Sequence, residues 1–114
     1  MSEHSLWQRI RNNVGHTGHF ARIEFNPEAG IPDVTFCRHK VEGFMELKFC
    51  AEAPARVNTR VFGEAGLRTS QVAWIYTRVK HGGRVWIVPE IAGVIYLVPG
   101  SYCRKFNEMT LRQI

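Results

Sequence analysis

A carboxylate and an ammonium group lie two residues apart inside an apolar stretch of this chain, Gly43-Phe44-Met45-Glu46-Leu47-Lys48-Phe49. The stretch is typical of a strand, and side chains of a strand alternate between its two faces, so Glu46 and Lys48 share one face. An exposed pair of this kind contributes only ~0–1 kcal/mol. The apolar flanks instead predict a central strand, where a charge pair is costly unless a metal ion or other partners compensate it.

A second carboxylate precedes this strand in Pro32-Asp33, and twelve residues separate it from Glu46. The interval holds the rest of one strand, a turn and the start of the next, so both carboxylates can lie beside one metal ion. Mg²⁺ prefers oxygen ligands, which suits Asp33, Glu46 and the Leu47 backbone carbonyl. Lys48 beside such an ion can orient the attacking water, and this pattern indicates hydrolysis of a phosphodiester. An ordinary turn aspartate is the alternative for Asp33 taken alone.

These residues resemble the PD-(D/E)XK nuclease superfamily, and within it the small stand-alone VRR-NUC domains of phages and bacteria. The resemblance covers residues 22–88 and implies an α/β fold, in which helices flank a central mixed sheet of the restriction-endonuclease type. It adds an upstream acidic residue, Glu24, and a glutamine at the start of a helix, Gln71. Glu24 would bind a second metal ion or its water, or instead pair with Arg22. Gln71 would contact the lysine or the attacking water.

The activity implied by the resemblance is a metal-dependent DNA endonuclease that uses Mg²⁺ or Mn²⁺ and leaves a 5′-phosphate. Stand-alone members similar to this chain act as homodimers on branched DNA, including Holliday junctions. The catalytic residues would be Glu24, Asp33, Glu46, Lys48 and Gln71. The alternatives are a nicking enzyme, an RNA-directed nuclease of the same fold, and a non-catalytic nucleic-acid-binding accessory module.

The net charge of +5 and the pI near 9.5 suit a partner with a phosphate backbone. Arg22, Arg68 and Arg78 are the first candidates for DNA contacts, because their expected faces agree with those of Glu24 or Gln71. Arg56 and Arg60 fall in the long segment 50–68, for which we favour a DNA-contacting flap over an edge strand. A solvated surface charge is the alternative for each arginine.

A chain of 114 residues suits a single nuclease domain, 1–114. No apolar run approaches the roughly 18–20 residues that span a bilayer, and Met1-Ser2-Glu3-His4-Ser5 lacks a signal-peptide pattern. We therefore expect a cytoplasmic protein with no membrane partner, in the host cytoplasm if a phage encodes it.

Periodicity and turn signals predict the remaining elements. A helix should begin with Ser5 as its cap and run to residue 14, and a second should begin with Thr69 or Ser70 as its cap and run to about residue 81. Strands are expected at 19–26, 33–38, 43–49, 84–88 and, after a turn at Pro89-Glu90, at 93–98. The strands around the second helix should be parallel neighbours. Residues 91–98 could supply a dimer surface or a buried last strand, and the chain from Ser101 a short helix or a loose tail.

Overall fold

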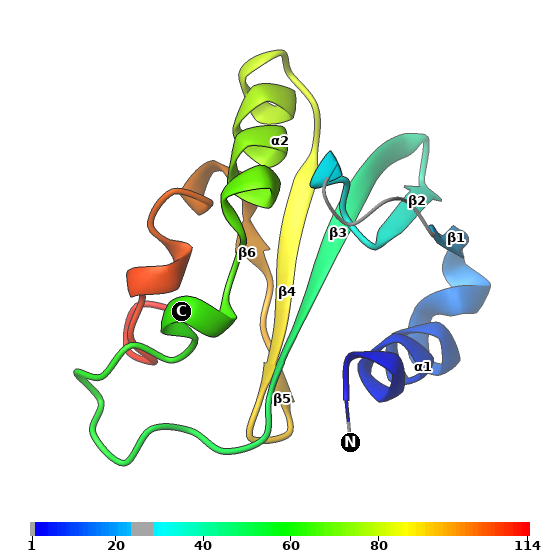
Figure 1. The fold of residues 1–114 in the computed structure, drawn as a ribbon. Helices are drawn as coiled ribbons and strands as arrows, with labels where there is room; N and C mark the ends of the chain where they lie inside the picture. Colours follow the sequence, from blue (N-terminus) through cyan, green and yellow to red (C-terminus); the bar gives the residue numbers. More distant parts are fainter. Residues whose placement is uncertain (1, 24–28) are drawn as a thin grey trace.

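The computed structural model describes residues 2–23 and 29–114 (Figure 1). Its elements follow in chain order: α1 (Glu3–Val14), β1 (His19–Arg22), β2 (Val34–Arg38), β3 (Val41–Cys50), α2 (Thr69–Lys80), β4 (Val85–Ile91), β5 (Val94–Ile95) and β6 (Val98–Pro99). Short 3-10 helices, among them η3 (Gly63–Ala65), η4 (Gly100–Tyr102) and η5 (Phe106–Glu108), lie between and after them.

The strands form one mixed sheet in the order β1-β2-β3-β4-β5, with β6 also paired to β4. Strands β3 and β4 are parallel, whereas every other pair is antiparallel. Helix α2 connects the two parallel strands, as the sequence predicted for neighbours joined by a crossover. The expected α/β fold with a mixed sheet is confirmed.

One helix covers each face of the sheet (Figure 1). The apolar stripe of α1 packs on one face, in a core that contains Leu6, Trp7, Ile10, Val34, Met45, Leu47 and Val88. The other core lies under α2 and includes Leu67, Ile75, Val85, Ile87, Ile91, Val98, Cys103 and Phe106. Strand β3 therefore sends Met45 and Leu47 toward α1, while Glu46 and Lys48 face the α2 side, as the alternation predicted.

Both helix starts differ from the predicted ones. Ser2, and not Ser5, caps α1: its hydroxyl accepts a hydrogen bond from the Ser5 N–H at 3.3 Å, and the Ser5 hydroxyl accepts one from the Ser2 N–H at 2.7 Å. Arg68 precedes α2 in the cap position, and its N–H donates to the Gln71 Oε1 atom. The side chain three residues after the cap accepts a hydrogen bond from the cap N–H in each case, so each cap residue lies before the predicted one.

The predicted buried side of α2 is only partly correct. Ile75 is fully buried and Val72 and Val79 are half-buried, but Tyr76 is 42% exposed. The Arg104 guanidinium lies 4.5 Å from the centre of the Tyr76 ring. A cation from the C-terminal segment therefore partly covers this ring, at a position that the helical stripe alone assigns to the core.

The predicted turn at Pro89-Glu90 is wrong, because β4 continues through both residues to Ile91. Proline lacks an N–H, and its place in a central strand requires a gap in the ladder. Such a gap exists here: β5 pairs with Glu90 and Ile91, and β6 with Trp86 and Ile87. The predicted last strand, 93–98, is accordingly divided into β5 and β6, whose connection passes this gap.

The segment after β3 does not form an edge strand, which was the alternative to the predicted flap. Its residues 55–60 are exposed, and its only paired strand position in the described chain is the bridge of Arg60 with Thr110. Phe62 and Phe106 stack with ring centres 5.2 Å apart and are both buried. The chain after Ser101 is therefore packed against the core and is not a loose tail. Among the described residues, no helix is long and apolar enough to cross a membrane.

Gly30 brings the loop before β2 against the first turn of α2. Its φ of +75° is in the left-handed region, and a Cβ atom there would lie 2.1 Å from the Ser70 carbonyl oxygen. A residue with a side chain would have to separate this loop from α2. A glycine is thus required at position 30 of Gly30-Ile31-Pro32-Asp33, because the loop that leads to Asp33 packs closely against α2 there.

Gly30→Ala should lower the free energy of unfolding by about 2–4 kcal/mol, since it adds a backbone clash to the cost of positive φ. Gly93→Ala is the matched control, because Gly93 has a φ of +84° and a Cβ atom added there would meet no other atom within 4 Å. Urea denaturation of both variants measures the difference. Equal losses in the two variants would contradict the role assigned to the Ser70 contact.

Candidate functional site

The Asp33 carboxylate lies where β2 separates from β3. The pairing of the two strands ends at Val34 and Met45, and the buried Pro32 has no N–H with which to extend it. In place of a backbone partner from β2, the Asp33 Oδ2 atom accepts a hydrogen bond from the Leu47 N–H at 3.0 Å. The N–H and C=O of a strand residue project to the same side, so the Leu47 carbonyl is also directed into the opening beside Asp33.

Glu46 is the buried carboxyl group of the site, with only 1% of the residue exposed. Its Oε2 atom accepts a hydrogen bond from the Gln71 Nε2 at 3.0 Å and lies 3.4 Å from the Lys48 Nζ. Its Oε1 atom is buried and has no hydrogen-bond partner among the described residues. A buried carboxylate oxygen without a donor is costly, so this atom needs either a proton or a bound cation.

Gln71 connects the two charged residues of β3 to α2. While its amide donates to Glu46, its Oε1 atom accepts from the Lys48 Nζ at 3.3 Å and from the Arg68 N–H at 2.9 Å. The residue is 5% exposed, so these three hydrogen bonds fix its side chain in one orientation. The contact of this glutamine with the lysine is the one that the resemblance implied.

Glu3, at the start of α1, is the third carboxylate of the site. Oxygen atoms of Glu3, Asp33 and Glu46 all lie within 4.8 Å of one another, a group that can hold a metal ion. The sequence reasoning missed Glu3 because it began the helix at Ser5 and left the residue outside. The reciprocal Ser2 and Ser5 pair was the available signal, since it places Glu3 in the first helical turn.

The electrostatics of this cluster disfavour three separate negative charges. Burial, and after it the nearby Asp33, raise the pKa of Glu46 to about 8, while Lys48 opposes the change. Much of the Glu3 residue is exposed, yet partial burial of its carboxyl group raises its pKa, with Lys48 acting in the opposite direction. Nearby cations do not offset these effects, so a divalent cation would be favoured there.

The predicted DNA-binding arginines occupy three different places. Arg22 and Arg68 lie close enough to Glu3 for their charges to lower its pKa. Arg78 lies further along α2, over the Trp74 and Phe44 rings. In the described part of the chain, no hydrogen bond or ion pair joins Arg56 or Arg60 to the carboxylates. Glu24 lies outside the described residues.

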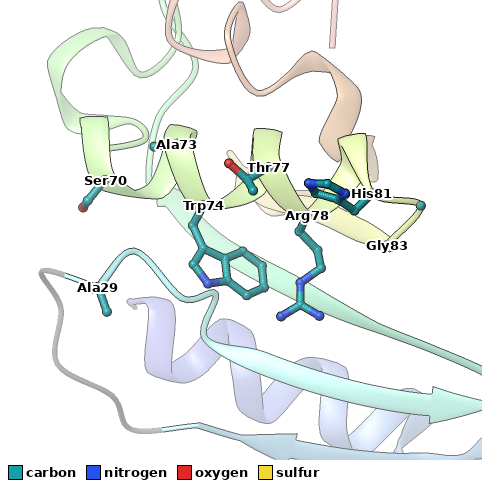
Figure 2. A pocket seen from close by; sticks show the side chains of 9 residues that line it. Ala29, Ser70, Ala73, Trp74, Thr77, Arg78, His81 and Gly83 are labelled. Carbon is teal, nitrogen blue, oxygen red and sulfur yellow. The ribbon is translucent and has the colours of Figure 1, made fainter.

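Of the three carboxylates, Glu3 borders a small hollow. Glu3 and Lys48 line this hollow of about 310 Å³ together with Ser2, Phe49 and Ala65. A larger hollow, about 830 Å³, runs along α2 and includes none of the three carboxylates (Figure 2). The chemistry of the residues, and not the size of the cavity, identifies the site.

Comparison with known proteins adds no relative. No protein-family model matches the chain, and no curated protein matches it at a significant level.

The raised pKa of Glu46 predicts how the metal-free protein responds to pH. The folded state binds a proton at Glu46 up to about pH 8, whereas an unfolded glutamate loses it near 4.5. Between these values the folded state holds more protons, so stability should fall as pH rises, by a few kcal/mol in total.

Urea denaturation in EDTA across this range measures the effect. Glu46→Gln should flatten the profile and be more stable than wild type at the alkaline end. Glu108→Gln, which removes an exposed carboxylate, is the control. A wild-type profile as flat as that of Glu46→Gln would show that Glu46 does not titrate in this range.

Proposed function

We propose that this protein is a metal-dependent endonuclease that hydrolyses phosphodiester bonds of DNA, as its resemblance to the PD-(D/E)XK nucleases implies. One observation carries the proposal. The Glu46 Oε1 atom is buried without a partner among the described residues, in a cluster with two further carboxylates and beside Lys48. A salt bridge that served only stability has no need of such an oxygen, whereas a cation can bind it.

The donor set fits Mg²⁺ or Mn²⁺. Both are hard cations that take carboxylate and carbonyl oxygens, and the cluster offers Asp33, Glu46, Glu3 and the Leu47 carbonyl. When bound, such an ion neutralises charge on a phosphate group and lowers the pKa of a water that it binds. Glu24 remains a further candidate ligand on the grounds of resemblance alone.

Lys48 is the residue we assign to the attacking water. Its Nζ atom is held by the Gln71 Oε1 and the Glu46 Oε2, and the side chain also borders the open hollow beside Glu3. An ammonium group fixed in this way can donate a hydrogen bond to a water or to a phosphate oxygen in the hollow. Gln71 acts as the positioning residue, because it fixes both Lys48 and Glu46.

The substrate we favour is branched DNA, including four-way junctions, cut by a homodimer in the cytoplasm. The net charge of +5 supports binding to a phosphate backbone. Two cuts in opposing strands need two active sites, which a dimer supplies. Val94, in β5, and Leu97, between β5 and β6, are 51% and 63% exposed and so offer apolar surface for a second copy. Ile91 and Val98 are buried.

A cleavage assay tests the activity. Its labelled substrates are four-way-junction, duplex and single-stranded DNA and RNA, each with Mg²⁺ or Mn²⁺ at one salt concentration. Asp33→Asn, Glu46→Gln and Lys48→Met should each lower the cleavage rate by roughly a hundredfold or more. Lys105→Met removes an exposed charge and should have little effect. Binding without cleavage of any substrate would replace this proposal with a non-catalytic accessory module, and cleavage of RNA alone with an RNA-directed nuclease.

Glu3→Gln tests the third carboxylate through binding of Mn²⁺ alone. Excess Mn²⁺ should raise the melting temperature of the wild type, because a ligand that binds only the folded state stabilises it. The increase should be absent in Asp33→Asn and clearly reduced in Glu3→Gln. Glu64→Gln, an exposed carboxylate of η3, should respond like the wild type. A full wild-type increase in Glu3→Gln would remove Glu3 from the site.

A further inference from the structure

A large hollow runs along one side of α2 (Figure 2). It has a volume of about 830 Å³, within the range of pockets that hold ligands the size of a nucleotide. Ala29 and Ser70 line one end, and His81 and Gly83 line the other. We call this hollow the α2 groove.

The Trp74 ring and the Arg78 guanidinium line the middle of the α2 groove, and Phe44, outside its lining, packs against both. Trp74 and Phe44 meet edge to face, with ring centres 5.0 Å apart. The Arg78 guanidinium lies 4.7 Å from the centre of the Trp74 ring and 5.2 Å from that of Phe44. The stem of Arg78 passes close over Gly83, where a Cβ atom would come within 2.5 Å of the Arg78 Cγ. Arg78 is therefore held in place by rings and backbone.

The hydrogen-bond donors of this arginine are unpaired among the described residues. Arg78 is exposed, and among the described residues its guanidinium has neither a carboxylate partner nor a hydrogen-bond acceptor. A planar, preorganised guanidinium with free donors is suited to a phosphate group. Trp74 is half-buried, so part of its indole lines the groove beside this cation (Figure 2).

The α2 groove begins next to the carboxylate site. Phe44 and Glu46 face the same side of β3 two residues apart, which corresponds to about 7 Å. On α2, Gln71, Trp74 and Arg78 follow one another at separations of three and four residues, and so form one stripe. The glutamine end of this stripe contacts Glu46, and the arginine end lies in the groove.

We propose that the α2 groove binds an unpaired nucleotide adjacent to the phosphate that is cut, with Trp74 stacking on its base and Arg78 binding its phosphate. The position relative to the cut rests on the function proposed above. A base inside a duplex is stacked on its neighbours and presents no free face, whereas a single strand, or the unpaired bases of a branch, can stack on an aromatic side chain. The groove thus selects substrates by an unpaired base next to the scissile bond.

The experiment measures binding and not cleavage, in EDTA, by fluorescence anisotropy. The probes are a labelled oligodeoxyuridylate, an oligouridylate of the same length and a blunt DNA duplex. Arg78→Gln is compared with Arg104→Gln, a closely matched control, because Arg104 also lies over an α2 ring, Tyr76 at 4.5 Å, outside the groove. Trp74→Leu is compared in the same way with Tyr76→Leu.

Arg78→Gln should weaken single-strand binding roughly tenfold and reduce the dependence of log affinity on log salt by about one, since one phosphate contact is lost. Trp74→Leu should weaken it by about tenfold and abolish the tryptophan quenching that accompanies binding. The two controls should bind as the wild type does. A preference between the two oligonucleotides would identify the sugar that the groove accepts.

Equal losses in Arg78→Gln and Arg104→Gln, or duplex binding as tight as single-strand binding, would overturn this inference. Arg78 is exposed, so its variant stands as the test even if Trp74→Leu fails to fold. The two proposals fail separately. Cleavage with no groove-dependent binding overturns only the groove, and groove-dependent binding with no cleavage overturns only the nuclease.

Discussion

The structure depends on a carboxylate buried in the middle of a sheet. Glu46 lies on the central strand β3 with almost no exposure, and β2 and β4 flank this strand on its two sides. Water cannot solvate such a group, so the protein must supply its partners. Gln71 and Lys48 do so at one oxygen, and this requirement ties the first turn of α2 to β3. The second oxygen has no donor among the described residues, which leaves it available to a proton or a cation.

The surrounding fold leaves β3 unpaired on its β2 side next to Glu46. Because β2 ends its pairing at Val34, Asp33 can bind the Leu47 N–H, and the parallel partner β4 closes the other side. Gly30 lets the preceding loop approach α2 at Ser70, which brings Asp33 and Gln71 to the same end of the sheet. The capping residue of α1 completes the arrangement, since a helix that starts at Glu3 places a third carboxylate there.

The sequence predicted a residue's place well when its contacts lie close in sequence, and poorly when its contacts join distant segments. Glu46 and Lys48 were placed together by strand alternation, a purely local rule, and they lie 3.4 Å apart. Gln71 could be assigned only by resemblance, because its partners are 23 and 25 residues away. Pro89 was misread as a turn, since the gap that tolerates it is created by two later strands. Tyr76 was misassigned to the core because its covering residue, Arg104, belongs to the C-terminal segment.

Local patterns of residues were enough to establish the mixed α/β sheet, the central position of β3 and the pairing of charge on one of its faces, because these follow from periodicity over a few residues. Packing established the rest: Glu3 joins Asp33 and Glu46, Glu46 keeps one oxygen without a donor among the described residues, and Arg78 rests on Trp74 and Phe44. These are contacts between separate elements. They arise when helices and strands pack at particular distances and angles, and no local pattern of residues records that packing.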